Sequence, residues 1–277
     1  MSRSPLLPTD ESPKQSPVSV IMPTFCQRPE WLRLAVLSVL GQSHVPRELI
    51  VVTAPGEKNL GLLINWQGDL GHECTGLEGE SHVPWLKILE APAPSVHGQW
   101  AYGMQRATGS MLTKCDSDDF LLPGKLELEV GMLDRNEDMH VSYTGFFYCD
   151  EGLHPGGRFG LESYIPGALV RACVISEGAV IRTDLWKQVG WLDTTFGYAA
   201  YWDAVLKMTE RVPDGVAYDS VPTWLYRQHG SQVSSKELQM EKHQNLRLQV
   251  VKNHFDRIGK KMPDLTISVG PTRMRDV

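Results

Sequence analysis

Short apolar runs alternate with longer amphipathic stretches along the first half of the chain. Residues 18–22 and 48–53 are rich in β-branched and aliphatic residues, and each predicts a buried strand. Between them, apolar residues recur at helical spacing from Leu32 to Leu40, which predicts one amphipathic helix with Pro29 at its start. The order strand, helix, strand predicts a β-α-β unit, in which the two strands are parallel and the crossover is right-handed.

The same alternation continues, with one interruption. Residues 54–84 have weak periodicity and are rich in Gly, Glu and His, so the sequence assigns no element to them. Residues 86–89 predict a third strand, apolar residues from Trp100 to Ala107 share a helical face, and residues 111–115 predict a fourth strand.

The second half of the chain contains shorter elements. Its expected strands are residues 141–149, 179–181 and 224–226, and its expected helices are residues 123–136, 184–189, 203–211 and 234–258. The Gly-rich residues 151–166 predict a mobile loop. Together these elements predict an α/β fold with a central mixed, mostly parallel sheet flanked by helices.

Three carboxylates crowd the end of the fourth expected strand. Asp116, Asp118 and Asp119 follow that strand directly, with Ser117 between the first two. Crowded acids repel one another, and hard oxygen ligands suit Mg²⁺ or Mn²⁺. An acidic turn that caps the following helix is the alternative. Open α/β sheets bind ligands at the carboxyl ends of their strands, so the position favours a binding site.

Composition narrows the class of protein. With 277 residues, of which 42% are hydrophobic, the chain can bury a sizeable core. Its net charge of −6 argues against a surface that coats nucleic acid. The five cysteines are scattered without CxxC spacing, which predicts reduced thiols in a cytoplasmic protein. No apolar run is long enough for a membrane span, and residues 1–17 predict a disordered leader.

The order of these segments resembles the family 2 glycosyltransferases, which have the Rossmann-like GT-A fold. The resemblance extends from about Val18 to Ser235 and is strongest in four places. These are residues 18–25, residues 38–43 followed by 48–52, the acids 116–119 with Pro123, and residues 190–193 followed by Tyr226-Arg227-Gln228-His229. The acid stretch looks like the DxD motif of that family.

The resemblance implies a domain organisation and a reaction. Residues 18–235 would form the GT-A domain, with a nucleotide-binding half at 18–123 and an acceptor half at 124–235, and residues 236–277 would add a C-terminal helix and tail. The protein would be a metal-dependent glycosyltransferase that moves a sugar from a nucleotide-sugar donor to an unidentified acceptor. A UDP-sugar is the default donor because it is frequent in the family, and Mn²⁺ or Mg²⁺ would neutralise the departing diphosphate.

The resemblance also assigns residues to this site. Asp118 is the best candidate for the metal ligand, and Asp116 would lie near the ribose or the water shell of the metal. His229 matches a late histidine near the metal and diphosphate, and a neutral imidazole suits Mn²⁺. Residues that would contact the nucleotide are Pro23, Thr24, Phe25, Arg28, Thr53, Asp116 and Ser117.

Two departures from the family pattern affect the chemistry. The family usually carries an Asp just after the second strand, which contacts the base, whereas Thr53 here offers a hydroxyl and no charge. The family also supplies its general base from a Glu-Asp pair at the start of a helix, and that pair falls on Ala200-Tyr201. A tyrosine with a pKa near ~10 is a poor base at neutral pH.

Three interpretations of the missing acid pair remain open. Asp203 could be the base, although an acid at a helix N-terminus is also stabilised by the helix dipole alone. Glu177, just before an expected strand, could reach into the site instead. The protein could also retain the sugar configuration, or bind sugar nucleotides without turnover. A nucleotidyltransferase is a further alternative, but residues 23–28 lack the glycine-rich, basic phosphate loop that it would need.

Overall fold

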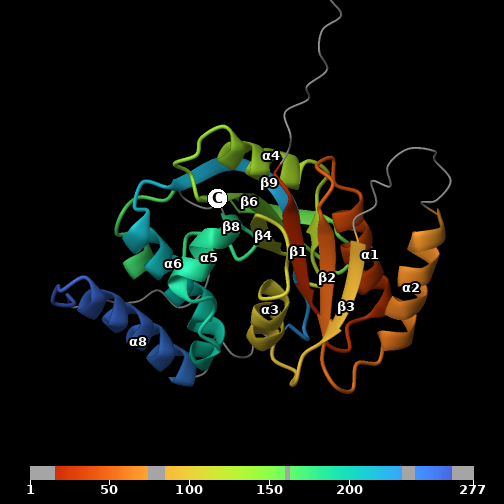
Figure 1. The fold of residues 1–277 in the computed structure, drawn as a ribbon. Coiled ribbons are helices and arrows are strands. Elements are labelled where there is room, and N and C mark those ends of the chain that lie inside the picture. The colour runs from red at the N-terminus through yellow and green to blue at the C-terminus, as the bar shows by residue number, and fades with distance from the viewer. Residues whose placement is uncertain (1–15, 74–84, 160–162, 233–240, 264–277) are drawn as a thin grey trace, which may run out of the picture.

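The computed structural model describes residues 16–73, 85–159, 163–232 and 241–263. One nine-stranded sheet runs through the molecule, with helices on both faces (Figure 1). The strands are β1 (Val18–Pro23), β2 (Glu48–Thr53), β3 (Trp85–Glu90), β4 (Met111–Lys114), β5 (Phe120–Leu121), β6 (Val141–Cys149), β7 (Pro155–Phe159), β8 (Val180–Arg182) and β9 (Val216–Arg227).

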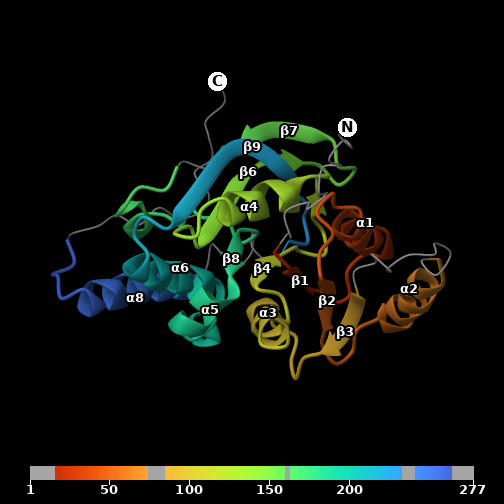
Figure 2. The ribbon, with the colours of Figure 1, turned by 45° about the horizontal axis from the view of Figure 1, so that its top comes forward.

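The strand order combines a parallel half with a mixed half. Eight strands follow the order β3-β2-β1-β4-β8-β6-β9-β5, and β7 pairs with β6. Strands β3, β2, β1 and β4 are parallel to one another, whereas β8 is antiparallel to both β4 and β6. Strand β9 runs parallel to β6, and both curve over the centre of the molecule (Figure 2). The predicted fold class, a mixed α/β sheet flanked by helices, is confirmed.

Helices cover the two faces of the sheet in separate groups. The α-helices are α1 (Pro29–Leu40), α2 (Leu60–Glu73), α3 (Val96–Met104), α4 (Lys125–Asp134), α5 (Thr183–Val189), α6 (Ala200–Arg211) and α8 (Glu241–Arg257), and the 3-10 helices are η1 (Ala168–Val170) and η2 (Thr194–Ala199). Buried residues of α1, α2 and α4 belong to one core cluster, and those of α3, α5, α6 and α8 belong to the other.

Strand β1 shows how the sequence pattern produces these two cores. All six of its residues are buried. Val20 and Met22 point to the cluster that contains α1, and Ile21 points to the cluster that contains α3, because successive side chains of a strand alternate between faces. Helix α3 approaches the sheet closely at Gly103, where an added Cβ would lie 2.7 Å from the Ile21 side chain.

Several expected boundaries differ from the observed ones. Helix α4 begins at Lys125 and not at Pro123, because Gly124 has a left-handed backbone with φ of 95°. Strand β9 begins at Val216, well before the expected residue 224. The C-terminal helix is described over Glu241–Arg257, and residues 234–240 of the expected helix lie outside the described residues.

Two segments contain elements that the sequence did not indicate. Residues 54–84 were left unassigned, and helix α2 begins there at Leu60, with Leu63 fully buried in the α1 core. Residues 151–166 were expected to be a loop, but residues 155–159 form β7, an antiparallel partner of β6. Glycines normally weaken a strand, so the hairpin with β6 prevails over the local preference of Gly156 and Gly157.

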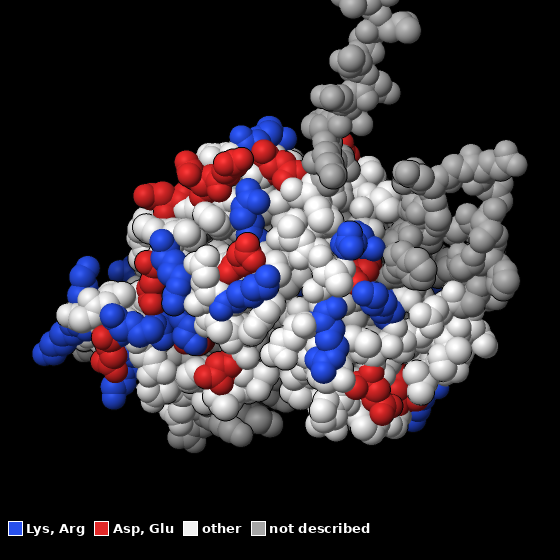
Figure 3. All heavy atoms as spheres, viewed as in Figure 1, with Lys and Arg blue, Asp and Glu red and all other residues white. Residues whose placement is uncertain are grey.

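The ends and the surface add three observations. Residues 1–15 of the expected leader lie outside the described residues, and Ser16 hydrogen-bonds Asp134 of α4. Within the described residues, no helix is long and apolar enough to span a membrane. Lysine and arginine side chains are interspersed with acidic ones over the face of the described residues in Figure 3.

Candidate functional site

The acidic stretch lies at the carboxyl end of β4, as the sequence predicted. The amide of Cys115 donates to the carbonyl of Ile21, which continues the pairing of β4 with β1 by one residue. The chain then turns, and the amide of Asp119 donates to the carbonyl of Asp116 at 3.1 Å. Because β1 and β4 are parallel, the end of β1 at Pro23 lies at the same edge of the sheet.

Asp118 and His229 meet at this edge from distant parts of the chain. The Oδ2 atom of Asp118 lies 2.9 Å from Nε2 of His229, which follows the end of β9. The other ring nitrogen, Nδ1, lies 2.8 Å from the hydroxyl of Ser231. The side chains of Asp118 and His229 are 19% and 5% exposed, so the pair is largely shielded from water.

This pair fits a divalent cation. Two ligands at neighbouring corners of an octahedron, each with a bond of about 2.1 Å, lie roughly 3 Å apart, which matches the observed separation. The Ser231 hydroxyl can accept a hydrogen bond from Nδ1, which leaves Nε2 free to bind a metal. Within the described residues, no group of three or more His, Cys, Asp and Glu is arranged to hold a metal. Water and phosphate oxygens would therefore supply the remaining ligands.

Arg227 joins β9 to the acidic stretch and is fully buried. Its Nε donates to the carbonyl of Asp118 at 2.6 Å, and its amide donates to Oδ1 of Asp119 at 3.0 Å. Its guanidinium also lies 4.7 Å from the ring centroid of Trp31, which in turn packs against His229. These contacts give Arg227 a structural role, because they hold the acidic stretch against the end of β9.

Asp119 has a structural role beside the pair. It is 3% exposed, and burial raises its pKa well above the ordinary value, with the nearby carboxylates of Asp118 and Asp116 adding to the effect. Its main polar partner is the backbone of Arg227. Of the three acids, Asp118 is therefore the one that lies beside a second candidate ligand.

Asp116 faces a different partner, the ammonium of Lys114. The Nζ atom of Lys114 lies 2.9 Å from Oδ2 of Asp116 and forms a second ion pair with Oε2 of Glu177. Burial lowers the pKa of Lys114, but the two carboxylates outweigh it and raise the pKa well above the ordinary value. Lys114 is 4% exposed, so the cation that pairs with Asp116 is buried.

Glu177 belongs to the same cluster of charges. Burial raises the pKa of its carboxyl, but the Lys114 ammonium and His97 outweigh burial and hold the pKa well below the usual range. Its Oε1 atom lies 3.9 Å from Nε2 of His97, and its side chain is 37% exposed. Lys114 thus forms ion pairs with both Asp116 and Glu177, so it bridges these two carboxylates in space.

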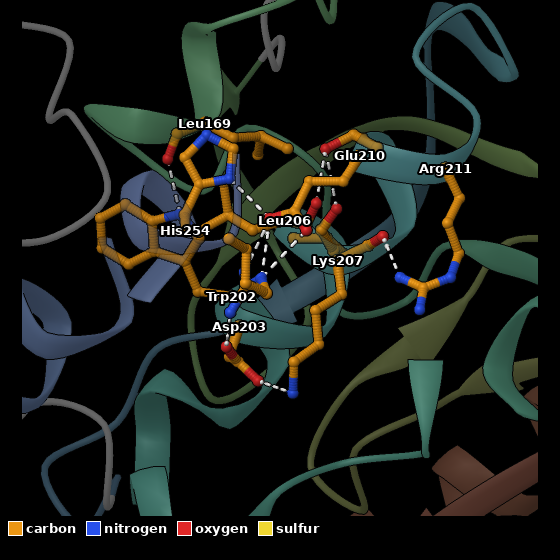
Figure 4. A network of polar contacts seen from close by, with 11 residues as sticks. Leu169, Trp202, Asp203, Leu206, Lys207, Glu210, Arg211 and His254 are labelled. Atoms are coloured by element: carbon orange, nitrogen blue, oxygen red, sulfur yellow. Dashed lines mark hydrogen bonds and ion pairs between the residues drawn. The ribbon is translucent and has the colours of Figure 1, made fainter. Parts of the chain in front are cut away.

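Asp203 lies in another environment. It is 1% exposed, and its carboxylate lies 2.5 Å from Nζ of Lys207 and 3.5 Å from a guanidinium nitrogen of Arg257. Figure 4 shows this carboxylate in the polar network of α6, together with Glu210 and His254. The described contacts of Asp203 join α6 to α8 and include none of the other predicted site residues.

Tyr201 occupies the position of the acid pair together with Ala200, and both are buried. The Tyr201 hydroxyl donates to the carbonyl of Ser176 at 2.6 Å, and its ring packs 5.5 Å from that of Trp100. Trp202 is also buried, and its indole nitrogen donates to the carbonyl of Leu169. Both aromatic residues are part of the core.

The predicted nucleotide contacts after β1 begin with two buried residues. Pro23 and Thr24 are buried, and Gln99 of α3 donates to the carbonyl of Thr24 at 2.7 Å and to that of Val52 at 2.8 Å. Phe25 is 45% exposed, which leaves its ring available for a ligand. The loop is therefore held by its backbone while one aromatic ring faces outward.

The remaining predicted nucleotide residues have different surroundings. The Thr53 hydroxyl donates to the carbonyl of Leu89 at 3.1 Å, and the residue is fully buried, so this hydroxyl faces inward. Arg28 pairs with Glu151 at 2.9 Å, and both side chains are 51% exposed. An exposed pair of this kind contributes little to stability, so Arg28 can exchange its partner for a phosphate. Ser117 is buried.

Sequence reasoning missed three residues of the site, Lys114, His97 and Gln99. The only signal for Lys114 was a cation inside an apolar strand, immediately before the acids. His97 and Gln99 lie on α3 and are both buried. Their roles depend on the packing of that helix on the sheet, which the sequence pattern does not reveal.

Comparisons with known proteins agree with this fold. No family model matches the chain. An uncharacterised glycosyltransferase of Rickettsia bellii is 26% identical over 179 residues, which is 61% of this chain and 23% of that protein. This chain therefore spans about a quarter of the length of that relative.

Solved glycosyltransferases have the same architecture. S. aureus TarS 1–349 superposes with a TM-score of 0.60 at 13% identity, covering 89% of this chain and 76% of that one. Its complex with UDP-GlcNAc gives 0.61 at 12% identity, covering 87% and 72%. Glucosyl-3-phosphoglycerate synthase of Mycobacterium tuberculosis, in complex with Mn²⁺, UDP and glucosyl-3-phosphoglycerate, gives a TM-score of 0.57 at 15% identity, covering 89% of this chain and 81% of that one. The chain thus has the GT-A fold of glycosyltransferases.

Proposed function

We propose that this protein is a glycosyltransferase of the family 2 type. It would transfer a sugar from a UDP-sugar to an acceptor hydroxyl with inversion at the anomeric carbon. The proposal depends chiefly on one observation, the Asp118–His229 pair beside the Lys114–Glu177 pair at the carboxyl end of β4. The neighbours that bind UDP or UDP-GlcNAc with the same fold support it.

Asp118 and His229 would hold the divalent cation and, through it, the diphosphate of the donor. When bound, the cation neutralises the charge that develops on the leaving diphosphate. Arg28, at the exposed start of α1, would contact a phosphate oxygen in exchange for Glu151. Phe25 would lie against the base, because it is the exposed aromatic residue of the loop after β1.

Glu177 is the better candidate for the general base. Asp203 is buried between two cations of α6 and α8, whereas Glu177 keeps part of its carboxylate exposed next to Asp116. Because its pKa is held low, Glu177 is ionised at neutral pH and accepts a proton only when that proton has become acidic.

The reaction would proceed by a single displacement. The acceptor oxygen forms a bond to the anomeric carbon while the bond from that carbon to the diphosphate oxygen breaks, and UDP leaves with the electron pair. As the new bond forms, the proton of the acceptor hydroxyl becomes acidic and passes to Glu177. Lys114 stays charged and keeps the carboxylate in place throughout.

Turnover of a panel of UDP-sugars with Mn²⁺ tests this proposal. We expect release of UDP and an inverted anomeric centre by NMR. Glu177→Gln should lower kcat by roughly 10²- to 10⁴-fold with donor affinity nearly unchanged, as for the loss of a general base. Glu127→Gln, the same substitution at an exposed position of α4, is the control. A fully active Glu177→Gln variant, or a retained anomeric centre, would contradict the proposed mechanism.

A protein that binds sugar nucleotides without turnover is the second candidate. It is favoured by the burial of both residues at the position of the acid pair, Ala200 and Tyr201. Tight binding of UDP without product from any donor would support this second candidate.

A further inference from the structure

The two residues that flank Glu177 are fixed to three different elements by their backbone carbonyls. The carbonyl of Ser176 accepts a hydrogen bond from the Tyr201 hydroxyl of α6 at 2.6 Å. The carbonyl of Gly178 accepts from Nζ of Lys125 at 2.7 Å and from the hydroxyl of Thr113 at 2.8 Å. The peptide before Glu177 and the carbonyl of Gly178 after it are therefore held, and the Glu177 side chain forms an ion pair with Lys114.

The Tyr201 hydroxyl is suited to donate this hydrogen bond and not to accept a proton. Burial raises the pKa of Tyr201 well above its ordinary value, with nearby ionisable groups adding to the effect, so the phenol keeps its proton. The ring is 2% exposed and packs in one cluster with Trp100 and Trp186, whose ring centroids lie 5.5 and 6.4 Å away. This packing gives the hydroxyl a fixed direction toward Ser176.

We infer that Tyr201 is a positioning residue, whose hydroxyl holds the Ser176 carbonyl and thereby sets the carboxylate of Glu177 against Lys114 beside Asp116. The inference rests on the proposed function for its catalytic meaning. A tyrosine at the start of α6 would thus act through Glu177, which is contributed by the segment before β8.

The expected effect of removing this hydroxyl is local. In Tyr201→Phe the ring and its packing against both tryptophans are retained, but the Ser176 carbonyl loses its donor from α6 and keeps the Ala179 amide of its own turn, at 3.0 Å. The Gly178 carbonyl keeps Lys125 and Thr113, so the segment stays folded. The peptide before Glu177 gains freedom, and the carboxylate is held less firmly.

A matched variant separates positioning from general destabilisation. Thr209, also on α6, is buried and donates its hydroxyl to the carbonyl of Val205 at 3.0 Å. Thr209→Val removes a buried hydroxyl from the same helix and leaves the Ser176 carbonyl intact. In hydrogen exchange measured by mass spectrometry, Tyr201→Phe should speed exchange in peptides that cover Glu177 by about 5- to 10-fold, the effect of one net hydrogen bond. Thr209→Val should leave these peptides unchanged.

Kinetics then test the link to catalysis. Tyr201→Phe should lower kcat by about 10-fold or more with the donor KM unchanged, because the base is displaced and the donor site is not. Thr209→Val should retain wild-type kcat. The double variant Tyr201→Phe/Glu177→Gln should be no slower than Glu177→Gln, since the hydroxyl acts through that carboxylate.

The outcomes are distinguishable. Unchanged exchange around Glu177 in Tyr201→Phe would overturn the inference, whether or not the enzyme has turnover. Equal changes in Tyr201→Phe and Thr209→Val, or additive losses in the double variant, would also overturn it. A wild-type protein without product from any donor would instead contradict the proposed function, and the exchange measurement would still decide the role of Tyr201.

Discussion

Lys125→Met should strongly destabilise the fold, because Lys125 neutralises a buried carboxylate beneath the site. Lys125 is fully buried, and its Nζ lies 2.6 Å from Oε2 of Glu129, which is also fully buried. The other oxygen of Glu129 accepts from the Thr144 hydroxyl at 2.6 Å. Removing one partner of a buried ion pair typically costs about 3–5 kcal/mol, because the remaining charge is uncompensated.

The structure also predicts a pH dependence for this loss. Burial raises the pKa of Glu129, while the Lys125 ammonium opposes that shift. Without Lys125 the folded-state pKa rises further above the unfolded value of about 4.3. A carboxyl with a raised folded pKa contributes stability below the unfolded pKa and loses it as the pH rises through the folded value. The penalty of Lys125→Met should therefore be largest near pH 7.5 and smaller near pH 5.

Urea unfolding at both pH values measures this difference. The double variant Lys125→Met/Glu129→Met should recover most of the lost stability, leaving a deficit of about 1 kcal/mol from the hydrogen bond of Lys125 to Gly178. Lys187→Met, which breaks an exposed pair with Asp184, should cost less than about 1 kcal/mol. A loss below 1 kcal/mol for Lys125→Met, or an equal loss at both pH values, would refute the reasoning.

The remaining predictions concern three residues that the sequence analysis assigned to the site. Asp118→Ala should lose Mn²⁺-dependent binding of UDP in calorimetric titration while the fold remains intact. Unchanged affinity would mean that the acidic stretch is only a turn and binds no metal. His229→Ala should weaken UDP by about 10- to 100-fold and uridine much less, since its expected neighbours are the metal and phosphates, and equal losses would place it away from the phosphates. Asp203→Asn should lower stability by about 1–3 kcal/mol, because Lys207 and Arg257 lose a charged partner, with kcat unchanged; a large fall in kcat at normal stability would restore it as the base.

Strands β1, β2 and β4 of the parallel half were predictable because their residues are uniformly buried. In β1 and β2 every side chain is buried, so the apolar run itself marks the strand. Helix α2 could not be assigned because its apolar residues do not mark a buried face, and only Leu63 of its described side chains is buried. Strand β7 was missed because Gly156 and Gly157 carry no local preference for a strand, and the pairing with β6 supplies the order.

The candidate site was only partly predictable for a similar reason. Asp118 could be located because it follows an apolar strand, and its contact with His229, 111 positions away, came from a family resemblance. The cluster around Lys114 could not be read from the sequence, since it joins α3, β4 and the segment before β8. The sequence left Asp203 and Glu177 as alternative general bases. The structure distinguishes them, because the packing of α6 against α8 pairs Asp203 with Arg257.

A crystal structure with Mn²⁺ and UDP tests the central claim most directly. We expect the ion between Asp118 and His229, in place of their hydrogen bond, with diphosphate oxygens completing its shell and Ser231 bonded to the imidazole. Glu177 should keep its ion pair with Lys114, and its carboxylate should lie near the bound diphosphate. A diphosphate bound elsewhere, with the Asp118–His229 hydrogen bond intact, would contradict the account.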